Sequence, residues 1–171
     1  MMTTSAVVKL ACQSLTHYLQ TGQVMAPPVQ LDKEMTGKAG VFVSLKKQGE
    51  LRGCIGTFAP TKNTVAEEII ANAVSAGTQD PRFHPVTLNE LPEITISVDI
   101  LNEPERVDSL EVLDPQRYGV IVRRGRRSGL LLPMLEGVDT PEYQVSIAMQ
   151  KAGISPGEEI ELYRFTVTRY L

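Results

Sequence analysis

One cysteine of this sequence has neighbours that could support chemistry. Cys54 lies in the stretch "GELRGCIGTF", residues 49–58, between Gly53 and Gly56 and two positions after Arg52. The thiolate is the reactive form of cysteine, and a nearby cation favours it. Small neighbours leave room for a substrate, so the setting suits a nucleophile. Arg52 could lower the pKa of the thiol or hold a carboxylate or phosphate through two hydrogen bonds.

The same stretch also has a purely structural interpretation. Free cysteines are often buried as small apolar side chains. Glycine inside a strand often marks a bulge or a close approach of other atoms, and Gly53 and Gly56 would then only allow the strand to bend. The sequence leaves both interpretations of Cys54 open. The second cysteine, Cys12, falls on an amphipathic helical pattern and is expected to be structural.

The loop "TQDPRFHPVTLNELPE", residues 78–93, supplies candidate partners for the thiol. Asp80 precedes a proline and favours a turn. His84 is the only histidine outside the first helical pattern and is the candidate general base for Cys54. Asp80 and Arg82 could bind a ligand or form an internal ion pair that pins the loop, and the second role is slightly preferred. Three further carboxylates near the adjoining strand could act as acids or bases, although spacing singles out none of them: Glu90, Asp99 and Glu103.

The elements that must position these residues follow from periodicity and turn signals. Three helices are expected: one capped by Thr3, Thr4 or Ser5 and ending at Gly22, one from Thr64 to Gly77, and one from Thr140 to Gly153. Strands are expected at 41–45, 50–58, 94–101, across a hairpin at 118–133, and in one piece at 160–171. Simple alternation puts Arg52, Cys54 and Gly56 on one strand face. Helices and hairpins are interspersed without a βαβ repeat, which predicts an α+β fold with a mainly antiparallel sheet and flanking helices, as a single domain over residues 1–171.

Composition excludes several classes of function. A hydrophobic share of 42% and a charged share of 22% are typical of a globular domain, and a net charge of −3 gives no general attraction to nucleic acid or anionic membranes. No apolar run reaches the roughly 20 residues needed to span a bilayer, and the N-terminal stretch does not resemble a signal peptide. Two cysteines are too few for a disulfide framework, so reduced thiols in the cytoplasm are expected.

Two other binding classes receive little support. The two cysteines and two histidines lack metal-ligand spacing, so no metal site is expected. The run "RRGRR", Arg123 to Arg127, could grip phosphates, but no aromatic residues interleave with it. It is interpreted as a solvated hairpin tip whose four like charges are separated by water, which argues against a nucleic-acid partner.

Three blocks carry a family resemblance. "LRGCIGTF", "DPRFHPVTLNELPEITISVDIL" and "YGVIVRRGRRSGLLLP" resemble the successive signature blocks of the AMMECR domain family, whose prokaryotic members are called AmmeMemoRadiSam system protein A. The resemblance runs in the family's order over roughly Val41 to Gly153. The sequence departs from the pattern after Pro133, where "MLEGVDTPEY" replaces an expected tryptophan-containing segment. The family pattern does not demand histidine at His84.

The resemblance implies a fold of two unequal, interleaved lobes with the Arg-Gly-Cys-Ile-Gly stretch at a groove. It also implies association with a Memo-type protein, related in fold to extradiol dioxygenases, and with a radical-SAM enzyme. It supplies neither an established reaction nor a cofactor.

The resulting prediction is an accessory component of an AmmeMemoRadiSam-type system with a groove for a small anionic ligand or substrate. Cys54, Arg52 and His84 are its catalytic candidates, and the ligand-binding candidates are Gly53, Gly56, Asp80 and Arg82. The alternatives are a stand-alone cysteine-dependent enzyme acting on a small anionic substrate, and a nucleic-acid or regulatory binding module.

Overall fold

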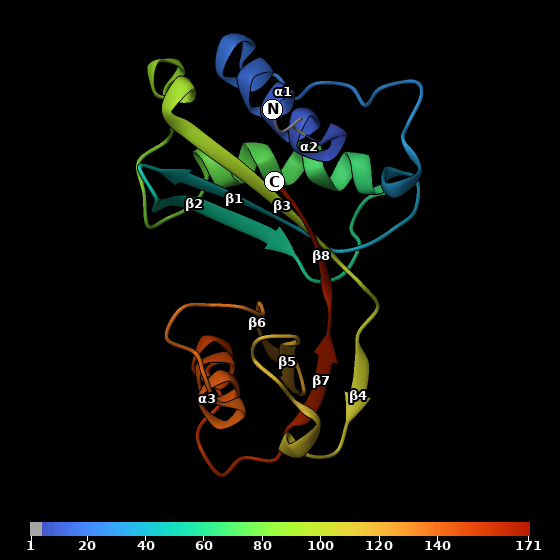
Figure 1. The fold of residues 1–171 in the computed structure, drawn as a ribbon, viewed down its shortest axis with the longest axis vertical. Coiled ribbons are helices and arrows are strands. Elements are labelled where there is room, and N and C mark those ends of the chain that lie inside the picture. Colours follow the sequence, from blue (N-terminus) through green and yellow to red (C-terminus); the bar gives the residue numbers. More distant parts are fainter. Residues whose placement is uncertain (1–4) are drawn as a thin grey trace. The chain divides into compact units, whose positions relative to one another are not determined.

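The computed structural model describes residues 5–171 as two compact units. The first unit comprises the chain up to Ile100 together with Thr168–Leu171, and the second is Leu101–Val167. The expected interleaving of two unequal lobes is therefore present along the chain, because the second unit is inserted into the first (Figure 1). Each unit has its own antiparallel strand pairs and its own helices, which confirms the α+β prediction.

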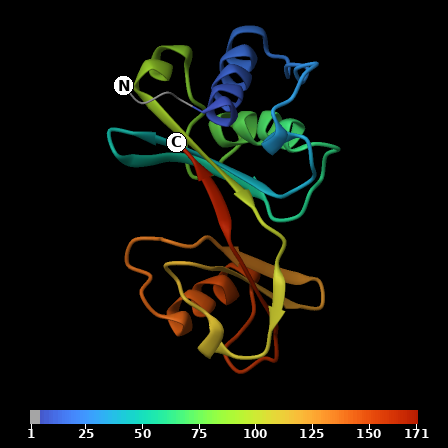
Figure 2. The ribbon, with the colours of Figure 1, turned by 45° about the vertical axis from the view of Figure 1, so that its right-hand side comes forward.

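The first unit consists of a four-stranded sheet with two helices on one side (Figures 1 and 2). The sheet order is β2-β1-β3-β8, and β1 pairs antiparallel with both β2 and β3. The strands are β1 (Val41–Lys47), β2 (Glu50–Thr57), β3 (Ile94–Leu101) and β8 (Val167–Tyr170), and the helices are α1 (Ala6–Thr21) and α2 (Val65–Thr78). Val41, Val43 and Leu45 of β1 are fully buried against this helical layer, as alternation requires.

Local capping explains where the two helices begin and end. The Ser5 hydroxyl accepts a hydrogen bond from the Val8 N–H, and Thr64 does the same for α2; Thr3 and Thr4 lie outside the described residues. Gly22 ends α1 in the left-handed conformation, as expected. The predicted end of α2 at Gly77 is wrong, since the helix continues to Thr78. A Cβ at Gly77 would lie 2.5 Å from a methyl carbon of Leu15, so this glycine lets α1 pack closely on α2.

A β-bulge interrupts β2 just before the cysteine. Leu45 is opposite Gly53 and Lys46 is opposite Leu51, so Arg52 is the extra residue. Alternation therefore breaks at Arg52, so the register does not place its side chain on one continuous strand face with Cys54. Beyond the bulge, Gly53 faces the helices, and Cys54 lies on the opposite face of the sheet.

The second unit has a sheet of order β4-β7-β5-β6 with α3 packed on β5 and β6. Its elements are β4 (Glu105–Val107), β5 (Gly119–Arg124), β6 (Arg127–Leu131), β7 (Glu161–Phe165) and α3 (Pro141–Ala152). Short 3₁₀ helices precede β1, precede β3 and follow β4, at Lys33–Met35, Leu88–Glu93 and Leu110–Val112. The helix α3 begins at a Pro at N1 behind Thr140 and ends at Gly153, both as predicted.

The C-terminal strand was predicted as one piece and is two. β7 and β8 belong to different sheets and are separated at Thr166. There the Thr166 carbonyl accepts a hydrogen bond from the Asn102 N–H, and its hydroxyl accepts one from the Asn102 amide. Both of these residues lie where the chain passes from one sheet to the other.

The basic hairpin tip is confirmed as a turn, but its charges are not simply separated by water. Gly125 adopts a φ of +60° in the turn between β5 and β6. Arg124 and Arg127 both form ion pairs with Glu158, and Arg123 lies over the Tyr163 ring. Two of the four arginines therefore share one carboxylate, which offsets one of the four positive charges.

The segment that replaces the expected tryptophan region leads into α3. Met134 has a φ of +62° and a half-exposed side chain, and its N–H donates to the Pro115 carbonyl.

Within residues 5–171, no helix has the length and hydrophobicity to cross a bilayer.

Candidate functional site

Cys54 lies on β2, an edge strand, with a half-buried side chain. Its Sγ is 3.2 Å from the Oγ of Ser44, the residue directly opposite on β1. This hydroxyl is the only side-chain hydrogen-bond partner of the thiol among the residues that the structure describes. The thiol is therefore held at the surface of the sheet that faces away from α1 and α2.

An ion pair clamps the backbone of Cys54. Asp80 accepts the Cys54 N–H at 3.0 Å, while Arg82 donates to the Cys54 carbonyl at 3.4 Å. The two side chains also bind each other through two hydrogen bonds of 3.0 and 2.8 Å. An edge strand leaves such backbone groups unpaired, so Asp80 and Arg82 take the place of a neighbouring strand. The expected internal ion pair is thus present.

Burial decides the protonation of the thiol. Loss of solvation raises the pKa of Cys54, and the Ser44 hydrogen bond and the Arg82 charge lower it by less. Asp99 and Asp80 oppose ionisation further. Since even an ordinary thiol is mostly protonated at neutral pH, the raised pKa favours the protonated form of Cys54. By contrast, Arg82 holds the pKa of the Asp80 carboxyl well below its usual range.

Arg52 is committed to the loop rather than to the thiol. Its Nε and Nη2 bind the two oxygens of Glu90 at 3.1 and 3.2 Å, and its Nη1 donates to the His84 carbonyl at 2.8 Å. A longer contact joins Nη2 to the Pro85 carbonyl. The anion that Arg52 was expected to recognise is therefore Glu90, whose pKa falls to about 2 because of these hydrogen bonds.

Glu90 also fixes the local fold of the loop. It completes a capping box with Thr87 at the start of the 3₁₀ helix, and it pairs with Lys47 at 3.3 Å. The imidazole of His84 is exposed, and no hydrogen bond joins it to Cys54 within residues 5–171. Glu103, the third candidate carboxylate, is exposed in the connection after β3.

The two glycines beside Cys54 are filled by the protein itself. A Cβ at Gly53 would lie 2.2 Å from the carbonyl oxygen of Ala76 in α2. A Cβ at Gly56 would lie 2.3 Å from the ring of Phe42. What approaches the strand at these positions is thus a helix backbone on one face and an aromatic ring on the other.

A second buried ion pair was not foreseen from the sequence. Asp99 of β3 is 3% exposed and binds Nε and Nη2 of Arg169 at 2.7 and 2.9 Å. Asp99 was considered only as an acid or base. The one available signal was a carboxylate inside the apolar strand 94–101, which needs a cationic partner when buried.

The sequence profile described as AMMECR1 matches residues 8–170. The chain belongs to the AMMECR1 family. It is 54% identical over 165 residues to a protein from Clostridium acetobutylicum and 51% identical over 166 residues to one from Thermotoga maritima. The chain covers 95% of the Thermotoga protein but only 35% of the Clostridium protein, so it spans about a third of that relative's length.

A crystal structure of an uncharacterized protein from Pyrococcus horikoshii has the same fold. It superposes with a TM-score of 0.88 at 33% sequence identity, covering 95% of this chain and 88% of the Pyrococcus chain. The AMMECR1 family thus explains why the signature blocks around Cys54, Asp80 and the β5–β6 hairpin follow one another in this order.

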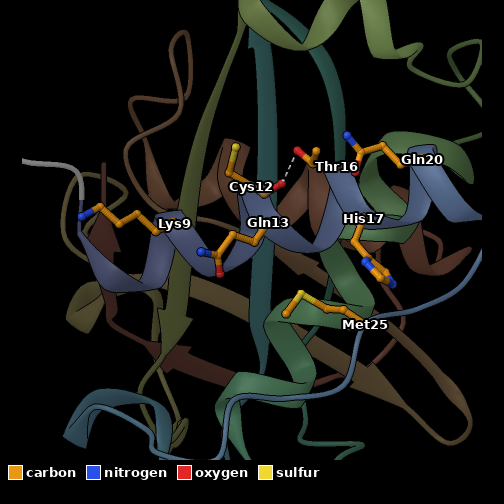
Figure 3. Close-up of a pocket in the computed structure, with 7 residues that line it drawn as sticks. All are labelled: Lys9, Cys12, Gln13, Thr16, His17, Gln20 and Met25. Atoms are coloured by element: carbon orange, nitrogen blue, oxygen red, sulfur yellow. Dashed lines mark hydrogen bonds between the residues drawn. The ribbon is translucent and has the colours of Figure 1, made fainter.

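Two hollows lie elsewhere on the first unit, and Cys54 lines neither. One, of about 360 Å³, lies between α2 and the segment around Met25. The other, of about 460 Å³, follows the outer face of α1 (Figure 3). Figure 3 shows Cys12 and His17 pointing to opposite sides of α1.

Cys12 is exposed, so the expectation that it is structural is wrong: it falls on the solvent side of the amphipathic helix. Within residues 5–171 no cluster of three metal-ligating side chains is present.

Proposed function

We propose that this chain is an accessory component of an AmmeMemoRadiSam-type system. In that system it would bind a Memo-like protein and a radical-SAM enzyme. In this proposal the Cys54 face of the first sheet is a recognition surface, and the thiol is a binding group rather than a nucleophile.

The state of Cys54 carries the argument. The thiol is half-buried, its pKa is raised, and within residues 5–171 its one side-chain hydrogen-bond partner is the Ser44 hydroxyl. Many nucleophilic thiols are activated by a base within hydrogen-bond reach and by a third group that orients the base. Neither contacts Cys54 among the described residues. A protonated thiol beside a hydroxyl is better suited to packing and weak hydrogen bonding with a bound group.

The Clostridium relative supports a cooperative role. Its segment similar to this chain makes up about a third of its length, so the remainder is covalently joined to an AMMECR1 unit. The Thermotoga relative has no comparable extra length, since the chain covers 95% of it. A unit that occurs both alone and joined to a longer sequence is expected to work beside another protein.

Binding measurements with the Memo-like and radical-SAM proteins of the same genome test this proposal. We expect the purified chain to form a complex with at least one of them in size-exclusion chromatography and biolayer interferometry. Cys54→Ser should change the Kd less than threefold, because serine preserves the size and hydrogen bonding of the side chain. Cys12→Ser on the outer face of α1 is the matched control. Absence of binding to both proteins would overturn the proposal.

An activity assay of the reconstituted system separates this function from that of a cysteine-dependent enzyme. If Cys54→Ser leaves binding intact but abolishes turnover, the thiol is a nucleophile and the recognition role is wrong. If binding and turnover both survive, the recognition role stands.

A further inference from the structure

The hollow of about 360 Å³ beside α2 has the make-up of a small-molecule site. Its floor is the apolar part of one stripe of α2, formed by Ile70, Ala71 and Val74. Ile70 and Val74 are only 3% and 5% exposed, so this apolar floor is shielded from bulk water. Pockets for small molecules typically enclose about 300–1,000 Å³ and combine a largely apolar lining with a few polar groups. The hollow therefore suits a ligand of small size.

The opposite wall of the hollow is the connection that follows α1, residues 24–31. Val24, Met25 and Pro27 of this connection line the hollow. Within the part of the chain that the structure describes, residues 24–31 form no hydrogen bond, and Met25 and Leu31 hold the connection by packing against the core. Such a wall can adjust around a ligand, because no hydrogen bond has to break.

Two side chains of opposite charge line the same hollow. Lys62 lies in the loop before α2, and Glu67 lies in the first turn of the helix. Within residues 5–171 neither side chain forms a hydrogen bond or an ion pair, since only their backbone N–H groups are bonded. One ammonium group and one carboxylate are therefore available beside the apolar floor. Groups of both signs match a zwitterion, whereas an anion would be repelled by Glu67 and a cation by Lys62.

The apolar part of the hollow is short. Val74 is seven residues after Glu67, which corresponds to about 10 Å along the helix axis. Beyond Val74 the hollow is lined by the polar residues Ser75 and Gln79. This length accommodates the side chain of one amino acid, and a long acyl chain would extend into the polar end.

We propose that the hollow between α2 and residues 24–27 binds a free α-amino acid with a large apolar side chain. Glu67 binds its ammonium group, Lys62 binds its carboxylate, and its side chain packs on the apolar floor. The site lies in the helical layer of the first unit, on the opposite side of the sheet from Cys54. It goes beyond the proposed accessory role, which requires no small-molecule ligand.

A series of L-leucine analogues tests the site on the unmodified protein. Binding is followed by ¹H–¹⁵N NMR titration, with the backbone amides of the apolar floor as reporters. We expect L-leucine to shift these signals saturably with a Kd below about 1 mM. Leucinamide lacks the carboxylate and 4-methylpentanoate lacks the ammonium group, so each should bind at least about tenfold more weakly. Glycine, which has no side chain, should give no saturable shift.

A variant that fills the hollow tests its location. Ala71→Leu places a larger side chain on the apolar floor and should abolish saturable binding of L-leucine, detected at the remaining floor amides and at Val24. Ser146→Leu adds an apolar side chain at an exposed position of α3 and is the matched control. It should leave the Kd unchanged.

Charge variants test the two assigned contacts one at a time. Lys62→Gln should weaken L-leucine about tenfold and remove the preference for L-leucine over leucinamide. Glu67→Gln should remove the preference for L-leucine over 4-methylpentanoate in the same way. Lys46→Gln and Glu142→Gln change exposed residues outside the hollow and should alter neither Kd nor preference.

Three results would overturn the inference: no saturable shift of the floor amides at about 10 mM L-leucine, analogues that bind as tightly as L-leucine, or binding that survives Ala71→Leu. The analogue series uses the wild-type chain, so misfolded variants cannot obscure its answer. Binding of a Memo-like or radical-SAM protein is measured separately and does not depend on this ligand. The two proposals can therefore fail independently.

Discussion

Gly53 offers the sharpest test of how the first unit is built. We predict that Gly53→Ala destabilises the protein because the new methyl group collides with α2. Its Cβ would lie 2.2 Å from the Ala76 carbonyl oxygen and 3.3 Å from the Ala76 carbonyl carbon. Ordinary contact begins at 3.4 Å, so strand and helix would have to separate by about 1 Å. The obstacle is helix backbone, which has no rotamer to change.

The magnitude follows from the cost of overpacking. Inserting a methyl group into a packed interior costs about 1–3 kcal/mol, and a backbone obstacle belongs in the upper part of that range. Alanine lowers the conformational entropy of the unfolded chain relative to glycine, which stabilises the folded protein by about 0.4–1 kcal/mol and offsets part of this loss. The net expectation is a loss of about 2 kcal/mol. With a urea m-value of about 2 kcal/mol/M, the unfolding midpoint should fall by about 1 M.

Gly37→Ala is the matched control. Its Cβ would meet nothing within 4 Å, and its φ is not in the left-handed region, so the substitution should leave the midpoint equal or slightly higher. Unfolding is followed by far-UV circular dichroism, because the chain has no tryptophan. If Gly53→Ala and Gly37→Ala both unfold at the wild-type midpoint with unchanged m, the packing explanation of Gly53 is refuted.

Three further predictions concern the candidate site and its loop. The alkylation rate of Cys54 with iodoacetamide should have its pH midpoint above that of the unfolded chain, since burial raises the pKa of the thiol; a lower midpoint would contradict the recognition role. Asp80→Asn should cost about 1.5–3 kcal/mol at neutral pH, measured by urea unfolding. The pKa of Asp80 is depressed, so wild type retains this advantage above about pH 4 and loses it on further acidification; a difference that persists in acid would contradict the assignment. Glu90→Ala should cost about 1 kcal/mol locally and speed amide exchange at Thr87, whose N–H it caps at 2.9 Å, whereas unchanged exchange would show that the cap is unimportant.

The helices and most strands could be predicted because their signals are local. Ser5 and Thr140 cap helices through their own neighbouring N–H groups, and Gly22 and Gly153 end them with a positive φ. Alternation along 41–45 reports burial on one face directly. These features depend only on residues within a few positions, so the sequence contains them explicitly.

The parts that sequence reasoning missed depend on distant partners. The bulge at Arg52 is a property of the register between β1 and β2, and alternation within β2 alone does not reveal it. Arg52 binds Glu90, 38 residues away, although Cys54 is only two residues away in the sequence. The division of the last strand at Thr166 likewise depends on Asn102, since the alternating pattern continues through it.

The arginine–carboxylate pairs of Arg52, Arg82 and Arg169 in the first unit differ in how many nitrogens of the guanidinium group they use. All three guanidinium nitrogens of Arg52 donate hydrogen bonds, to Glu90 and to the carbonyls of His84 and Pro85. The role of Arg52 in the structure is therefore to hold residues 84–90 against β2. Arg82 donates a hydrogen bond to the Cys54 carbonyl at the edge of β2, yet its side chain is more than half exposed.

Arg169 neutralises the buried carboxylate of Asp99 through Nε and Nη2, and its Nη1 makes no hydrogen bond within residues 5–171. Stability alone would be served equally well by apolar residues at Asp99 and Arg169, because replacing a buried ion pair with packed hydrophobic side chains is often neutral or favourable.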